Sequence, residues 1–362
     1  MSRRICRHGS SPARSLARHR GFSLIELMIA MALSLVVLGG AIAIFVSSRA
    51  TYETTDRLSR LQDNGRFALD TIVRDLRAAG YLGCARSASL NNLLAKPDDL
   101  QWNFEFGVQG LDAQDASWAP ALDGKAGIEP AAGSDILVVH SPRGEFEPVR
   151  VVAGWLMAST TDDIVTADET SSLIRAGDIV QISDCNARSV FQVTNAAAGV
   201  VSHAVGGDDT DKNLPGNASD DLNYAFTDAA ELVTLNSVVY YIAPTPDPET
   251  DAAPNLSLFR RVSGRLSERL QDEELAPGIE NMQLLFGELD GDTIDYRRAD
   301  QVGDWNRVQT VRVALLVRST SQFGTDRDNE TYELLDTEVQ AAGDRYLRQV
   351  FTTTVGVRNN PS

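Results

Sequence analysis

The chain has 362 residues, of which 43% are hydrophobic, and its formal net charge at pH 7 is −17. This length supports one sizeable globular core in addition to any peripheral segments. The strongly acidic balance disfavours direct nucleic-acid binding, because such binding depends on basic residues that displace counterions from phosphates.

A basic leader of 21 residues precedes a long apolar run. The leader contains six Arg and no acidic residue, which favours its retention on the cytoplasmic side of a membrane. The apolar run from 22 to 46 would extend about 38 Å as a helix, enough to cross a hydrocarbon core of roughly 30 Å. A secretory signal peptide has its apolar segment before the cleavage site, whereas here the small residue Gly21 comes first. Cleavage after Gly21 would therefore leave the helix on the mature protein and export the rest.

Glu26 is the one charged residue inside this apolar run. A carboxylate in a membrane helix costs at least about 2.5 kcal/mol, so it usually marks a functional position with a partner. Cleavage would create a new α-amino group on Phe22, one helical turn away, and the Glu26 of a neighbouring subunit could neutralise it. We predict that this pairing sets the axial register between subunits. The alternative is an ordinary single-span anchor in which the carboxylate has no role.

The N-terminal residues resemble the class III leader of type IV pilins and pseudopilins. The matching segment reads Gly21-Phe22-Ser23-Leu24-Ile25-Glu26-Leu27-Met28-Ile29-Ala30. The resemblance implies that a prepilin peptidase cleaves between Gly21 and Phe22 and N-methylates Phe22. It also implies that Glu26 drives subunit assembly and that the helices of sibling subunits pack together.

The helical pattern continues beyond the membrane segment. Apolar residues recur at spacings of three and four from Leu58 to Leu76, among charged and polar residues. We therefore predict one helix over 22–79, which ends at Gly80 because glycine tolerates the left-handed conformation after a helix. Gly39-Gly40 lies inside the span and indicates either close helix packing or, as in the pilin family, a zone that unwinds in the filament.

Three further segments are similar to minor pilins of the PilW family. They are residues 75–84, 278–287 and 342–355. This similarity implies a pilin-like α+β fold, in which the long N-terminal helix, membrane-embedded in its first half (22–46), packs on a mostly antiparallel β-sheet head formed by residues 80–362. The leader, 1–21, is absent from the mature protein in this scheme.

Residues after Gly80 are mostly typical of β-structure. Short apolar or alternating runs predict strands, and an amphipathic helix needs such a sheet to cover its apolar face. The expected strands are 135–139, 149–152, 178–182, 190–193, 237–242, 256–260, 308–317 and 347–357, with 178–182 and 190–193 as a hairpin. Two segments without a strand pattern, 91–133 and 196–223, are expected to be long surface loops.

Two cysteines, Cys84 and Cys185, remain after removal of the leader with its Cys6. In an exported domain they are expected to form one disulfide, which closes a loop of about 100 residues and contributes up to about 4.7 kcal/mol. Two buried free thiols are the alternative. A redox site is disfavoured because no Cys-x-x-Cys spacing is present.

The sequence contains few candidates for chemistry. None of the zinc-protease, nucleophile-elbow, phosphate-loop or dinucleotide motifs occurs, so neither catalysis nor a cofactor is expected. His140 and His203 lie beside apolar residues and are expected to be structural. Asp290, Asp292 and Asp295 form a weak calcium candidate, although a hairpin turn at Asp290-Gly291 explains the same residues.

Together these observations predict a minor pilin that primes or caps type IV pilus assembly at the inner membrane, with its head in the periplasm, and that then sits at the extracellular tip. The predicted partners are prepilin peptidase, other minor pilins, the major pilin and a tip adhesin. Adhesion and twitching motility are functions that such a filament serves. A type II secretion pseudopilin is the nearest alternative, and a surface-binding module that uses residues 91–133 or 196–223 is a second.

Overall fold

The computed structural model describes residues 23–81, 88–114, 117–119, 129–143, 148–166, 173–208, 214–245, 255–263, 272–322 and 324–359. Within the chain two compact units are distinguished, Met1–Thr55 and Asp56–Ser362. The boundary falls inside the helix rather than at its end. The predicted division into leader, helix and head therefore stays a prediction, and the two units are described separately below.

One long helix, α1 (Leu24–Ala78), confirms the predicted N-terminal helix. It is long and apolar enough to cross a membrane, with a mean hydropathy of 2.7 in its most apolar part. The helix continues through Gly39-Gly40, where a Cβ on either glycine would meet open space, with no atom beyond the adjacent helix backbone within 4 Å. Gly80 follows the end of α1 with φ of +69°, as expected for a left-handed terminating glycine. Its N–H donates to the carbonyl of His140 on β4 at 3.0 Å and so ties the helix end to the sheet.

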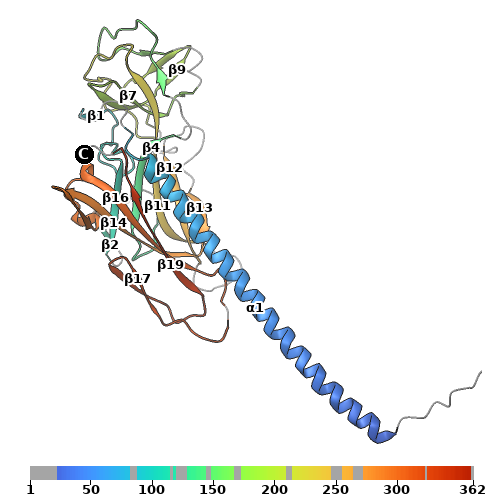
Figure 1. The fold of residues 1–362 in the computed structure, drawn as a ribbon. Helices are drawn as coiled ribbons and strands as arrows, with labels where there is room; N and C mark the ends of the chain where they lie inside the picture. Colours follow the sequence, from blue (N-terminus) through green and yellow to red (C-terminus); the bar gives the residue numbers. More distant parts are fainter. Residues whose placement is uncertain are drawn as a thin grey trace, which may run out of the picture. The chain divides into compact units, whose positions relative to one another are not determined.

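The head is built from β-strands in several sheets (Figure 1). The strands are β1 (Leu90–Asn92), β2 (Val108–Gln114), β3 (Ser117–Ala119), β4 (Ile136–Pro142), β5 (Val149–Arg150), β6 (Ile164–Val165), β7 (Ile179–Ser183), β8 (Arg188–Gln192), β9 (Asn195–Ala197), β10 (Val200–Ser202), β11 (Glu231–Thr245), β12 (Asn255–Ser263), β13 (Asp272–Pro277), β14 (Ile279–Asp290), β15 (Thr293–Arg297), β16 (Val308–Arg318), β17 (Thr331–Leu334), β18 (Thr337–Gln340) and β19 (Arg348–Gly356). Two short 3-10 helices, η2 (Ala299–Gln301) and η3 (Trp305–Arg307), lie between β15 and β16.

A ten-stranded sheet follows the order β1-β8-β7-β11-β4-β2-β3, with β5 and β12 also paired to β11, and with β13 paired to β12. A four-stranded sheet has the order β15-β14-β16-β19, and two smaller sheets are β6-β10-β9 and β17-β18. All the described pairings are antiparallel except that of β1 with β8. The predicted mostly antiparallel α+β head is therefore confirmed, including the β7–β8 hairpin.

The C-terminal half of α1 packs into the main core between strands of both large sheets. Leu61, Ala68, Ile72 and Leu76 are buried in one cluster with apolar residues from β2, β4, β11, β14, β16 and β19. Burial of these side chains is what holds the helix, at roughly 25 cal/mol for each Å² of apolar surface removed from water. A second cluster around Phe191 contains no residue of α1 and gives the part of the head around β5 to β10 its own core.

The two predicted surface loops are wrong in part, because each contains short strands and buried side chains. Residues 91–133 include β2, β3 and the buried side chains of Trp102 and Phe104. Residues 196–223 include β10 and the buried Asn217, whose amide accepts from the N–H of Gln192 and donates to its carbonyl, both at 2.7 Å. The Asn217 side chain satisfies backbone groups of Gln192 that a neighbouring strand would usually satisfy. This segment therefore joins the head without the alternating apolar pattern by which strands are predicted.

Candidate functional site: an apolar helix and an arginine cluster in the head

The first half of α1 exposes an almost continuous apolar surface. Its large side chains between Leu24 and Val46 are 54–79% exposed, and they lie on all sides of the helix. The hydroxyl of Ser34 donates to the carbonyl of Ala30 at 2.7 Å, so this side chain leaves no unbonded donor there. Such a helix is unfavourable in water and is expected to be covered by lipid or by other apolar helices.

Glu26 lies in the first turn of α1 and is exposed. Because the backbone N–H groups of a first turn carry a partial positive charge, a carboxylate is favoured at this position as well as near a neighbouring amine. Gly21 and Phe22 lie outside the described residues. Cleavage between them, N-methylation of Phe22 and the assembly role of Glu26 therefore stay predictions.

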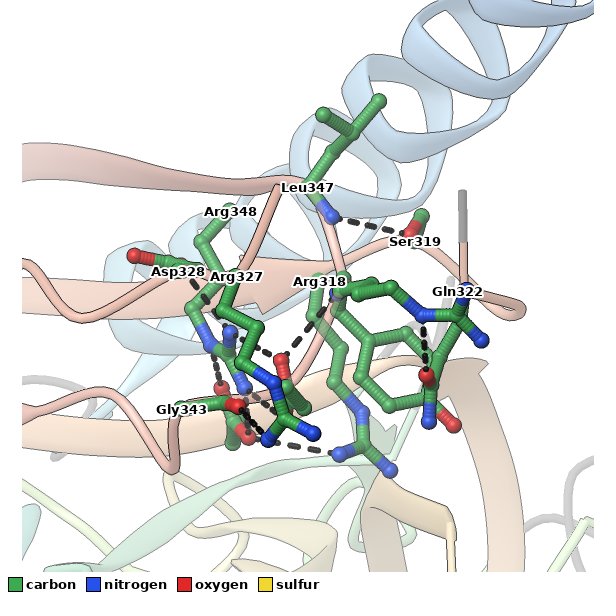
Figure 2. A network of polar contacts seen from close by, with 12 residues as sticks. Arg318, Ser319, Gln322, Arg327, Asp328, Gly343, Leu347 and Arg348 are labelled. Atoms are coloured by element: carbon green, nitrogen blue, oxygen red, sulfur yellow. Dashed lines mark hydrogen bonds and ion pairs between the residues drawn. The ribbon is translucent and has the colours of Figure 1, made fainter. Parts of the chain in front are cut away.

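Buried charges gather around Arg348 in the head, in what we call the Arg348 cluster: Arg348, Arg318, Glu280, Asp328 and Asp344. Figure 2 shows the arginine side chains with the loops that bring the acidic partners to them. The guanidinium of Arg348 is fully buried and binds Glu280 at 2.6 Å, Asp328 at 3.0 Å and Asp344 at 2.7 Å. Arg318 binds the same Glu280 at 3.3 Å. Two guanidinium groups thus face three carboxylates.

Electrostatics within the Arg348 cluster favour the charged forms. Burial alone would lower the pKa of Arg348, but the hydrogen bonds that its guanidinium donates to Asp344 and Glu280 raise it above its ordinary value. The hydrogen bond with Arg348 holds the pKa of Asp344 below its usual range. Burial raises the pKa of Asp328, yet the N–H of Glu330 and the side chain of Arg348 lower it overall. Each charged group of the Arg348 cluster therefore has a partner of opposite charge, and the cluster offers no unpaired group for chemistry.

The Arg348 cluster joins two of the segments that resemble the PilW family. Glu280 belongs to 278–287 on β14, whereas Arg348 and Asp344 belong to 342–355 at the start of β19. The end of β16 links the two segments through the backbone, since the N–H of Arg318 donates to the carbonyl of Gly278 at 2.7 Å and the N–H of Ser319 donates to the carbonyl of Leu347 at 2.8 Å. The sequence resemblance indicated these segments, but not that they bind each other.

The head also holds α1 through polar contacts. Arg57 donates to the carbonyl of Ser321 at 3.2 Å and to that of Gln322 at 3.0 Å, next to the Arg348 cluster. At the other end of the packed half, the amide of Asn359 donates to the carbonyl of Ala79 at 3.0 Å. The third resembling segment, 75–84, therefore includes the point where the C-terminal residues contact the helix end.

Asp75 and Tyr240 make a further contact between α1 and β11. The hydroxyl of Tyr240 donates to the carboxylate of Asp75. Burial, followed by the charge of Asp75, raises the pKa of Tyr240 above its ordinary value, so the phenol remains a donor at all physiological pH values. The contact fixes the rotation of the helix against the sheet.

Asp135 connects the two large sheets. Its carboxylate accepts from the N–H of Ala113 on β2 and from the N–H of Leu284 on β14, both at 2.8 Å. The side chain is buried, and burial raises its pKa to about 7 despite these two hydrogen bonds. Asp135 is therefore a titratable group inside the junction of the sheets.

This placement predicts a pH dependence of stability. Because the pKa of Asp135 is higher in the folded than in the unfolded chain, the folded state keeps its proton between about pH 4 and 7 while the unfolded state loses it. The free energy of unfolding should fall across this window by on the order of 4 kcal/mol. Denaturation of the detergent-solubilised chain at several pH values measures it, with Asp135→Asn removing the slope and the exposed Asp163→Asn keeping it. Parallel curves for all three proteins would contradict the assignment.

The predicted calcium candidate has a different arrangement. Asp290-Gly291 forms the hairpin turn between β14 and β15, as the alternative interpretation expected. The carboxylates of Asp290 and Asp295 lie 3.9 Å and 3.7 Å from the guanidinium of Arg297, which also binds Glu288 at 3.2 Å. No group of three potential metal ligands occurs among the described residues. Arg297 lies among these carboxylates, which favours the hairpin-turn interpretation over a calcium site.

Cysteine and histidine residues have structural surroundings. Cys185 is exposed and disulfide-bonded, whereas Cys84 lies outside the described residues, so the pairing of Cys84 with Cys185 stays a prediction. His140 is buried against Phe104, and its Nδ1 lies 2.8 Å from the carbonyl of Phe106. Burial lowers the pKa of His140 to about 4, which keeps the ring neutral. His203 is also buried and binds a backbone carbonyl.

Comparison with known proteins gives matches at both ends of the chain. Residues 239–359, which contain the whole Arg348 cluster, match the family described as Type IV Pilus-assembly protein W. Residues 16–42 match the prokaryotic N-terminal methylation motif. A pilin-like protein of Thermus thermophilus, PilA3, is 38% identical over 61 residues, which are 17% of this chain and 26% of that protein. The alignment thus spans about a quarter of the relative.

Proposed function

Because the chain is a type IV pilin-like protein of the PilW family, we propose that it is a minor pilin that primes or caps pilus assembly at the inner membrane and then sits at the filament tip. Its role in this proposal is structural rather than catalytic. The class III prepilin motif implies processing by prepilin peptidase and association with other pilins. The individual sibling subunits and a tip adhesin belong to the proposal.

The observation that carries the proposal is the exposed apolar half of α1 with its single carboxylate in the first turn. This surface anchors the chain in the membrane, and the same surface suits packing among sibling helices once the subunit leaves the bilayer. The tip is favoured over the shaft because the head has about 280 residues. In the shaft, subunits repeat the same contacts at close spacing, which leaves little space for a head of that size.

Removal of the carboxylate tests the assembly role. Glu26→Ala is expected to leave the chain in the membrane, because the apolar span is intact, but to reduce surface pili at least tenfold. Immunoblotting of sheared pili measures this, alongside the intact mass of the extracted chain from cells with and without prepilin peptidase. Asp63→Ala removes an exposed carboxylate elsewhere on α1 and is the matched control. Normal piliation in Glu26→Ala, or a chain not starting at methylated Phe22, would refute the proposal.

The match over residues 239–359 favours a pilus subunit over the type II secretion alternative. A deletion strain separates the two, because loss of twitching with normal secretion supports the pilus, whereas the reverse supports the secretion system. The surface-binding alternative relied on two surface loops, and part of each segment instead pairs as short strands in the sheets of the head.

A further inference from the structure

Strand β19 forms one edge of the four-stranded sheet. It has nine residues and pairs with β16 from Arg348 to Gly356 without any shift in register. Within the described part of the chain, no strand pairs with its outer side. A regular edge of this length presents a row of backbone donors and acceptors that have no partner in the sheet.

The register shows which backbone groups point outward. On either side of the strand, the N–H of Val357 donates to the carbonyl of Gln309 and the N–H of Ser319 donates to the carbonyl of Leu347, both at 2.8 Å. Odd-numbered residues of this segment therefore exchange hydrogen bonds with the β16 side, because the two kinds of pair alternate along an antiparallel ladder. The even-numbered residues point their N–H and C=O groups outward: Val350, Thr352, Thr354 and Gly356.

Other edges of the two large sheets are protected. Strand β13 carries Asp272, Glu273 and Glu274, ends in Pro277, and has a register shift opposite it in β12. Strand β15 has only five residues, and two of them, Asp295 and Arg297, are charged. The edge strands β1 and β3 have three residues each. Charges, proline, irregularity and short length are the usual protections against unwanted strand pairing. From Gln349 to Gly356, β19 has none of them.

A groove of about 580 Å³ lies beside this strand. Its lining consists of Thr352, Thr353 and Thr354 from β19, Arg312 from β16, and Glu333 and Leu335 from the β17–β18 hairpin. Thr352 and Thr354 are exposed. Because Arg312 pairs with Thr354, the groove lies over the face of β16 and β19 that carries Thr352 and Thr354. Its mixture of hydroxyl, charged and apolar groups suits polar side chains better than a purely apolar surface would.

We propose that β19 is a strand-addition site, where an extended segment of a partner subunit pairs with the outward groups of Val350, Thr352 and Thr354 as a fifth strand. Alternating N–H and C=O groups along an edge are complementary to another extended main chain, which identifies the occupant as polypeptide. This inference rests on the proposed function, because pilus assembly supplies the partner subunit.

Hydrogen exchange on single amides tests the site. The tagged full-length chain is extracted in detergent together with its co-purifying pilus subunits, and compared with the same chain after dissociation. The amides of Val350, Thr352 and Thr354 are expected to exchange at least tenfold more slowly in the complex, while Phe351 and Thr353 remain protected in both samples. Equal exchange of the even-numbered amides in a complex that holds the other subunits overturns this inference alone.

Edge variants give a second test. Thr352→Pro removes an outward N–H without removing a bond to β16, so the head should fold with an unchanged midpoint of denaturation while recovery of partner subunits falls at least tenfold. Thr352→Val retains the N–H and is the matched control, and Thr354→Lys adds a protecting charge if the proline variant is unstable. Normal recovery with both edge variants refutes the site.

Two further outcomes are distinguishable. If the even-numbered amides become protected in the isolated chain as its concentration rises, the edge pairs with a second copy, and the proposed partner is wrong. If no pilus subunit co-purifies and Phe22 is not the processed N-terminus, the proposed function fails and the inference fails with it.

Discussion

Arg348→Met is expected to lower the free energy of unfolding of the head by about 3–5 kcal/mol, the cost typical of removing one partner from a buried ion-pair network. The guanidinium is fully buried and binds three carboxylates at 2.6–3.0 Å. After its loss, Glu280, Asp328 and Asp344 would face each other with only Arg318 to offset their charge. Chemical denaturation of the detergent-solubilised chain measures the change.

The pH dependence identifies the cause. The pKa of Asp344 and that of Asp328 are lowered in the folded protein, so their stabilising contribution is present above their unfolded pKa values and is lost as the pH falls through the folded ones. In Arg348→Met the carboxylates repel each other, so the deficit should be larger at pH 8 than at pH 4. Arg345→Met, an exposed arginine nearby that binds Gln322, is the control and should cost less than about 1 kcal/mol. An equal deficit for both variants would contradict the importance of the cluster.

The elements that the sequence predicts well are those specified by local patterns. Helix α1 follows from its apolar run and from spacings of three and four, and its end follows from Gly80, because these signals depend on neighbouring residues only. The β7–β8 hairpin is predictable for the same reason. Glu26 is recognisable as a candidate assembly residue because a lone carboxylate in an apolar run is costly wherever the chain folds.

Features formed by distant residues were not predictable in the same way. Glu280 and Arg348 are 68 positions apart, and nothing in the local pattern of either segment indicates a partner for its charge. The carboxylate of Asp135 binds β14 at Leu284, 149 positions away, although its sequence neighbours are typical of an ordinary buried strand. Likewise, whether β19 is an edge or a central strand is decided by the order of strands in the sheet, which periodicity does not specify.

Gly278→Ala is expected to destabilise the head by about 3 kcal/mol, from two separate causes. Gly278 connects β13 of the larger sheet to β14 of the smaller one with φ of +80°, a conformation that costs a side-chain-bearing residue about 1–2 kcal/mol. An added Cβ would also lie 2.5 Å from the backbone carbonyl oxygen of Arg318, and overpacking of this kind costs about 1–3 kcal/mol.

The crowded position of Gly278 has little freedom to relax. Its N–H donates to the carbonyl of Leu256 at 3.0 Å, and its own carbonyl accepts from the N–H of Arg318 at 2.7 Å. Any shift that accommodates Cβ therefore stretches a hydrogen bond next to the Arg348 cluster. Gly291→Ala is the matched control, because Gly291 has φ of +61° but no atom within 4 Å of the new Cβ. The difference in denaturation midpoint between the two variants isolates the destabilisation that comes from the steric clash. Equal losses of stability would show that the backbone between the sheets shifts to relieve the clash, and that the left-handed conformation alone causes the destabilisation.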